Sequence, residues 1–100
     1  MDMIIINVLY TITDGKRDEF YRLLCDMGIG EKSRNENGNI KYDYYFSAEN
    51  PDGILLLEAW TNQEVLDAHA KSAHFLELQA VKKDYVTDVT IDKYTAEKII

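Results

Sequence analysis

The chain is poor in cysteine, and Cys25 is the only one among its 100 residues. A single cysteine cannot form a disulfide within the chain, which excludes the disulfide-stabilised folds of small secreted proteins. We expect Cys25 to be a small core residue, because it has no basic neighbour in sequence to activate it. No apolar run reaches membrane length, and the start of the chain lacks the pattern of a signal peptide. We therefore expect a cytoplasmic location and no membrane partner.

Basic residues are also scarce. Lys and Arg number 11 against 18 Asp and Glu, which gives a net charge of -7. Nucleic acids bind clustered basic residues, so no nucleic-acid partner is expected. The same balance argues against a highly phosphorylated substrate, although Lys82 and Lys83 could form a local basic spot. Hydrophobic residues make up 46% of the chain, an ordinary balance for a globular protein, and we expect one domain over residues 1–100.

Proline occurs once, in the turn sequence Asn50-Pro51-Asp52-Gly53. This turn joins two predicted strands, 40–47 and 54–60, into a hairpin. Two other runs rich in β-branched residues, 3–13 and 86–94, predict a first and a fourth strand.

Apolar residues at helical spacing predict the helices between these strands. The first begins after Asp14-Gly15 and can resume over residues 31–36; its apolar stripe consists of Phe20, Leu23, Leu24 and Met27. Thr61 or Asn62 can cap a second helix that carries His69, and Ser72 can cap a third that runs to about residue 81.

The resulting order of elements is β-α-β-β-α-β. With right-handed crossovers this order gives an α+β fold of the ferredoxin-like kind, a four-stranded antiparallel sheet with helices on one face. The other face would be bare and apolar, which predicts a homodimer formed through the sheet face, a dimeric α/β barrel.

The strand 54–60 and the helix after it bring together the residues best suited to chemistry. Glu58 and Trp60 share one strand face, where a carboxylate beside an indole and aliphatic side chains can have a raised pKa. The alternative is that Glu58 pairs with a lysine or a backbone amide. His69 lies on the apolar stripe of its helix and should face the sheet, either as a catalytic base or as a hydrogen-bonded core residue.

The two histidines, His69 and His74, are spaced poorly for a metal. Five positions correspond to about 140° around an unbroken helix, whereas a helical zinc pair has histidines four apart. We therefore expect no metal site, assign His69 to a pocket, and assign His74 a structural role near Ser72, where the chain can bend.

Two strands supply further candidates. Asn7 is a polar residue in an apolar strand and is either a ligand contact or locally hydrogen-bonded. In the strand 40–47, the period of two places Tyr42 and Tyr44 on one face with Ile40 and Phe46, as a wall for a ligand or as core packing.

The run EAWTNQEVLDAHAKSAHF, preceded by GNIKYDYYFS, resembles the antibiotic biosynthesis monooxygenase family of quinol-monooxygenase-like proteins. The family pattern falls here on Gly38, Tyr42, Glu58, Trp60, Leu66, His69, His74 and Phe75. The resemblance implies homodimers of ferredoxin-like subunits with a pocket between sheet and helices. Several family members oxidise phenols or quinols with O₂ and without a metal or flavin.

By this resemblance we expect a cofactor-independent monooxygenase that acts on a small quinol-like or polyphenolic substrate, with O₂ as co-substrate. The expected catalytic residues are His69, Glu58 and Asn7, and the expected substrate-binding residues are Trp60, Tyr44, Tyr42 and Phe75. One alternative is an isomerase or degradation enzyme for phosphorylated autoinducer-2, which the stretch 30–43 resembles. Another is a non-catalytic dimeric protein that binds small molecules. Haem degradation is disfavoured, because Gln79 stands where haem-degrading members carry the iron-ligating His.

Overall fold

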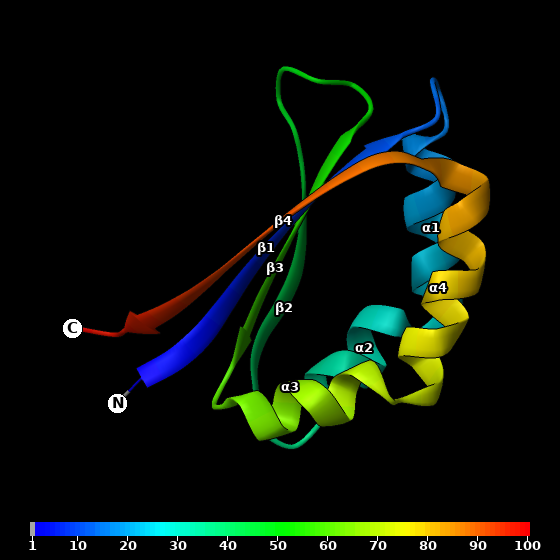
Figure 1. The fold of residues 1–100 in the computed structure, drawn as a ribbon. Helices are drawn as coiled ribbons and strands as arrows, with labels where there is room; N and C mark the ends of the chain where they lie inside the picture. The colour runs from blue at the N-terminus through cyan, green and yellow to red at the C-terminus, as the bar shows by residue number, and fades with distance from the viewer. Residues whose placement is uncertain (1) are drawn as a thin grey trace.

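The computed structural model describes residues 2–100 and arranges them as four antiparallel strands in the order β2-β3-β1-β4, with helices on one face (Figure 1). The elements are β1 (Asp2–Ile12), α1 (Arg17–Met27), α2 (Ile29–Arg34), β2 (Asn39–Phe46), β3 (Gly53–Trp60), α3 (Gln63–Ala70), α4 (Ala73–Tyr85) and β4 (Val86–Glu97). The predicted ferredoxin-like fold is confirmed, and each of its two crossovers contains a pair of helices.

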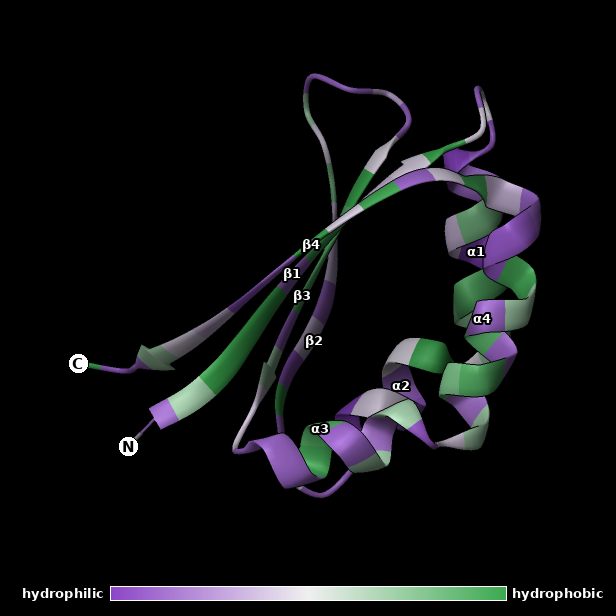
Figure 2. Cartoon of the chain, in the orientation of Figure 1, coloured by the Kyte–Doolittle hydropathy of each residue, from purple (hydrophilic) through white to green (hydrophobic). Residues whose placement is uncertain are grey.

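The core lies between the sheet and the helices. Strand side chains alternate between the two faces, so every second residue of β1 and β3 points toward α1 and α4. Figure 2 shows the apolar residues of the strands and of the inner helix faces. The buried apolar side chains include Val8, Tyr10, Phe20, Leu24, Ile54 and Leu56. Cys25 is exposed, contrary to the prediction, because it lies about 100° around α1 from Leu24.

The predicted helix caps are present at both helices that follow β3. The Asn62 side chain accepts the Val65 N–H at 3.0 Å and begins α3. The Ser72 hydroxyl accepts the Phe75 N–H at 3.3 Å and begins α4. Helix α4 runs four residues past its predicted end, and β4 follows it at Val86 without a loop.

A β-bulge at the start of β2 changes the predicted face of one residue. Asn39 pairs with Trp60 and Lys41 pairs with Ala59, so the register shifts between them. In a bulge two residues of one strand oppose one residue of the other. Ile40 therefore lies with Lys41 beside Leu57 on the face away from the helices, and it does not share a face with Tyr42 as the period of two predicted.

The sheet face opposite the helices is uncovered in the single chain, and most of the β1 and β3 side chains on it are apolar. Ile5, Leu57 and Ala59 lie on it, and Leu9 and Tyr94 are 48% and 53% exposed. In Figure 1, β1 and β4 extend beyond the helices toward the two chain ends. Within residues 2–100, no helix has the length and apolarity to cross a bilayer.

We propose that this bare face packs against the same face of a second copy, because an exposed apolar sheet face is otherwise unfavourable in water. Sedimentation at micromolar concentration should show a dimer. Leu57→Lys should give a monomer, since it places a charge in the middle of the bare face. Leu76→Lys is the matched control, because Leu76 is 59% exposed on α4. A wild-type monomer at this concentration contradicts the proposal.

Candidate active site

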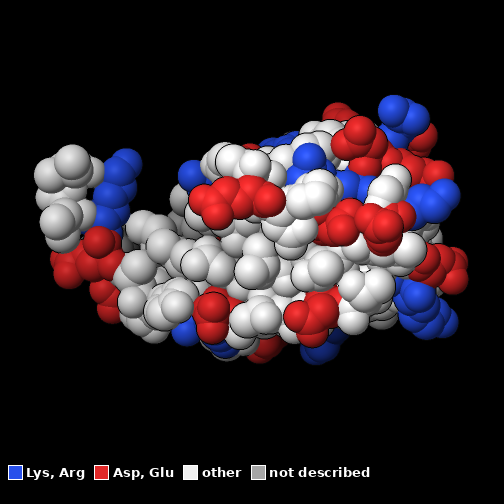
Figure 3. Space-filling view, turned by 90° about the horizontal axis from the view of Figure 1, so that it is seen from above, with Lys and Arg blue, Asp and Glu red and all other residues white. Residues whose placement is uncertain are grey.

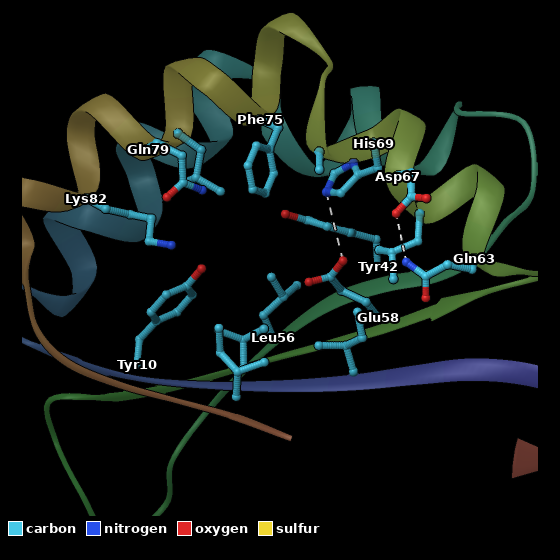
Figure 4. Close-up of a pocket in the computed structure, with 16 residues that line it drawn as sticks. Tyr10, Tyr42, Leu56, Glu58, Gln63, Asp67, His69, Phe75, Gln79 and Lys82 are labelled. Atoms are coloured by element: carbon cyan, nitrogen blue, oxygen red, sulfur yellow. Dashed lines mark hydrogen bonds and ion pairs between the residues drawn. The ribbon is translucent and has the colours of Figure 1, made fainter. Parts of the chain in front are cut away.

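A cavity of about 370 Å³ lies between the sheet and the helices α3 and α4. Its floor consists of aliphatic side chains of β1 and β3, among them Ile6, Val8 and Leu56, and Phe75 and Leu78 of α4 lie opposite. Polar groups stand at its two ends, as Figure 4 shows: Glu58 and His69 at one end, Tyr10 and Lys82 at the other. A volume of this size accommodates a small aromatic molecule.

The first end is organised by Glu36, which lies in the turn between α2 and β2. Its Oε2 is 2.5 Å from His69 Nδ1 and 2.7 Å from His74 Nε2. A carboxylate oxygen accepts hydrogen bonds, so we assign to each histidine the tautomer that donates its N–H to Glu36. This arrangement leaves His69 Nε2 as the free ring nitrogen.

The two histidines meet because the chain bends between α3 and α4. The Ser72 hydroxyl donates to the His69 carbonyl oxygen at 2.7 Å and lies 3.2 Å from His74 Nε2. The two imidazole ring centres are consequently 5.7 Å apart. The predicted bend at Ser72 and the placement of His74 near the start of α4 are confirmed.

Gly38 allows the turn that carries Glu36 to lie directly on α3. Its φ of 85° is in the left-handed region, which favours glycine. A Cβ at this position would lie 2.6 Å from Val65 Cγ1 of α3. The Gly38 carbonyl also accepts the Thr61 N–H at 2.9 Å. The position of Glu36 beside His69 therefore depends on a residue without a side chain.

Glu58 and Trp60 support His69 from the sheet. The Trp60 indole N–H donates to Glu58 Oε1 at 3.0 Å, and the same oxygen is 3.9 Å from His69 Nε2. The Trp60 and His69 rings are 4.6 Å apart. Burial raises the pKa of Glu58, and the Trp60 hydrogen bond and His69 oppose that rise. Within residues 2–100, Glu58 thus pairs with the indole, and not with a lysine or a backbone amide.

The tyrosines of the cavity are hydroxyl donors at neutral pH. Burial raises the pKa of both Tyr10 and Tyr42, with smaller contributions from Tyr44 and Glu58. The Tyr42 ring lies 5.7 Å from the His69 ring. Both tyrosines can therefore donate a hydrogen bond to a ligand oxygen.

Four of the seven predicted site residues line the cavity: Glu58, His69, Tyr42 and Phe75. Trp60 does not line the cavity, but its indole N–H donates to Glu58 and its ring packs against the His69 ring. Tyr44 points toward the helices but lines a separate cavity with Tyr21 and Leu24. Burial raises the pKa of Tyr44 to about 12.

The prediction of Asn7 as a catalytic residue together with His69 is wrong. Ile6 and Val8 line the cavity, and side chains alternate along a strand, so Asn7 points to the bare face of the sheet. Its partner in β3 is Leu57, which lies on that face.

Sequence reasoning missed three residues of the site: Glu36, Tyr10 and Lys82. The available signal for Glu36 was its position two residues before Gly38 of the family pattern. Tyr10 shares a strand face with Ile6 and Val8, and the sequence marks Lys82 only as part of a possible basic spot.

The cluster of Glu36, His69 and His74 also contains metal-binding atom types. Within residues 2–100 these three side chains place one such atom each within 4.8 Å of the others. The separations of 2.5 and 2.7 Å are those of hydrogen bonds, and they are shorter than the distance between two ligands of one zinc ion. In this arrangement Glu36 is hydrogen-bonded to both histidines, and the bend at Ser72 brings together two histidines that their spacing in the sequence had separated.

The fold and the cavity define a ferredoxin-like protein with a histidine at one end of a ligand-sized apolar pocket. Residues 3–81 match the model of the antibiotic biosynthesis monooxygenase family. The chain belongs to this family, as its sequence motifs predicted. Family membership supports a monooxygenase-like function in general terms.

Proteins of three organisms are similar to this chain in sequence or in structure. The chain is 27% identical over 85 residues to "Putative monooxygenase YcnE" of Bacillus subtilis, which covers 85% of this chain and 87% of the relative. A conserved protein of Methanosarcina mazei has a TM-score of 0.83 at 28% identity, with 94% of this chain and 92% of that chain covered. PA3566 of Pseudomonas aeruginosa shares the fold, with a TM-score of 0.87 at 20% identity and coverage of 98% and 97%.

His74→Ala should lower stability more than function. The variant removes one of the two N–H groups that Glu36 accepts, so we expect the free energy of unfolding to fall by about 1–2 kcal/mol. Thermal and urea denaturation measure this loss. Glu77→Ala, at an exposed position on the same helix, is the control. If His69→Ala destabilises the protein and His74→Ala instead abolishes ligand binding or turnover, the two roles are reversed.

Proposed function

We propose that the protein is a cofactor-independent monooxygenase that acts on a small quinol-like or polyphenolic substrate. The observation that supports this most is the pairing of His69 with Glu36 at one end of an apolar cavity. A base oriented by a carboxylate beside such a pocket suits the deprotonation of a phenol. The hydroxyl groups of Tyr10 and Tyr42 suit a substrate that carries oxygen substituents.

In this proposal His69 Nε2 accepts the proton of a substrate hydroxyl. Glu36, bonded at Nδ1, is a positioning residue that holds the ring in the tautomer with Nε2 unprotonated. The imidazolium that forms lies between two carboxyl groups, Glu36 and Glu58, and a nearby negative charge favours it. Glu58 accepts the Trp60 N–H and so stays at a fixed distance from the ring.

The chemistry needs no external reductant, because the substrate supplies all the electrons. A hydroquinone and one O₂ give a hydroxyquinone and one water. One oxygen atom forms a new bond to a ring carbon, while the other leaves as water. The ring loses four electrons and O₂ gains four. The apolar floor of the cavity shields one side of the deprotonated substrate from water.

The wild-type protein should consume one O₂ per quinol in an oxygen electrode with a panel of small hydroquinones. His69→Ala should lower the rate at least about a hundredfold, the loss that follows removal of a general base. Glu36→Gln should cause a smaller loss, because the base remains but its orienting carboxylate is gone. Glu77→Gln, an exposed substitution of the same type, should leave the rate unchanged.

Dialysis against a chelator should also leave the rate unchanged, since the proposal uses no metal. An unchanged rate in His69→Ala excludes His69 as the base. Rearrangement or breakdown of phosphorylated autoinducer-2 without O₂ consumption would support the isomerase or degradation enzyme considered from the sequence. Binding without any turnover would support the non-catalytic alternative.

A further inference from the structure

The end of the cavity away from His69 carries a cation. Figure 4 shows the Lys82 amine and the Tyr10 hydroxyl pointing toward each other, with Gln79 beside them and Leu56 between this end and Glu58. Lys82 Nζ lies 5.2 Å from the centre of the Tyr10 ring. Among the described residues that line the cavity, Lys82 is the only lysine or arginine.

Lys82 has no carboxylate partner. Within residues 2–100 none of the ion pairs includes its Nζ. Burial lowers the pKa of Lys82, and the charge of Glu58 opposes this effect. A partly buried cation without a counter-charge is unfavourable, and a bound anion would offset that cost.

The neighbours of Lys82 suit an anion as well. The Gln79 amide offers N–H groups and Tyr10 offers an O–H, because burial keeps Tyr10 protonated. The protein as a whole is acidic, with a net charge of -7, and Figure 3 shows side chains of both charges around a mostly uncharged area of one face. The family match ends at residue 81, so it does not account for Lys82.

From this geometry we propose that the cavity takes a phenolic compound with a carboxylate substituent, whose carboxylate binds Lys82 while its hydroxyl lies at the His69 end. The placement of the ligand hydroxyl beside His69 rests on the proposed function. The placement of the ligand carboxylate beside Lys82 does not depend on it. Tyr10 and Gln79 donate further hydrogen bonds to the carboxylate.

A carboxylate fits this end better than a phosphate does. One lysine matches one negative charge, whereas phosphate sites commonly add arginines or the backbone N–H groups of a helix start. Lys82 lies in the last turn of α4, where the helix dipole disfavours an anion and weighs most against the higher charge of a phosphate. The neighbouring Lys83 is exposed.

The test is a binding titration without O₂, so that turnover does not interfere. The probes are 2,5-dihydroxybenzoate and its methyl ester, which has the same ring and hydroxyl groups but no charge. Isothermal calorimetry gives both affinities, and the fluorescence of Trp60, the single tryptophan, gives a second reading. We expect the wild-type protein to bind the acid at least about tenfold more tightly than the ester, as a charge-assisted hydrogen bond predicts.

The variants assign this preference to one residue. Lys82→Met should abolish the preference for the acid, and Lys82→Arg should retain part of it. Lys83→Met removes the same charge one position away, outside the cavity, and should leave the preference unchanged. Circular dichroism establishes that each variant is folded; if Lys82→Met is not, Lys82→Gln replaces it.

Several outcomes overturn the inference. Equal binding of acid and ester by the wild-type protein excludes the carboxylate subsite, even if quinols are oxidised. So does an unchanged preference in Lys82→Met, or the absence of binding of either compound at millimolar concentration. Tighter, Lys82-dependent binding of 4-hydroxyphenyl phosphate replaces the carboxylate with a phosphate. If the acid preference depends on Lys82 but no compound is oxidised, the proposed function fails and the subsite stands.

Discussion

One carboxylate oxygen, Glu36 Oε2, accepts hydrogen bonds from both histidines of the chain, at 2.5 and 2.7 Å. The rest of the site depends on this junction. It joins the turn before β2 to the end of α3 and the start of α4, three segments far apart in the sequence. Because His69 is 3% exposed, its ring needs a partner for its polar atoms, and Glu36 supplies one. The second ring nitrogen is then directed toward Glu58 at the end of the cavity.

The cavity separates opposite charges across an apolar floor. Glu58, buried to 7% exposure, accepts a hydrogen bond from Trp60 at one end, and Lys82 stands at the other without a carboxylate of its own. Burial disfavours the charged form of both groups, as the raised pKa of Glu58 and the lowered pKa of Lys82 show. Such a pocket favours a ligand that is apolar in the middle and polar at both ends.

Local patterns in the sequence were sufficient for the fold. The turn at Pro51, the caps at Asn62 and Ser72 and the alternation along β1 each determine a structure within a few residues, and each was found as predicted. Ile40 was misplaced because a β-bulge leaves no clear trace in an alternating pattern. Asn7 was misplaced for a different reason. It was chosen because it is a polar residue in an apolar strand, although the period of two puts it on the opposite strand face from Ile6 and Val8.

Local sequence patterns could not identify Glu36, the residue that joins the two histidines. Glu36 is 33 positions from His69 in the sequence, and only the folded chain brings them together. The sequence did indicate a bend at Ser72. Because of this bend His69 and His74 lie on two different helices, so the angle of about 140° expected on one unbroken helix does not apply. Contacts of this kind depend on how loops pack against helices, as Gly38 does against Val65, and no periodicity describes them.

The most direct test of this account is the protonation of the two ring nitrogens of His69, read by ¹⁵N NMR at a pH where the ring is neutral. With two histidines in the chain, the His69→Ala spectrum assigns the signals. The account predicts that Nδ1 carries the proton and Nε2 does not, and that Glu36→Gln changes this tautomer. A His69 ring protonated at Nε2 in the wild-type protein, or a tautomer unaffected by Glu36→Gln, would contradict it.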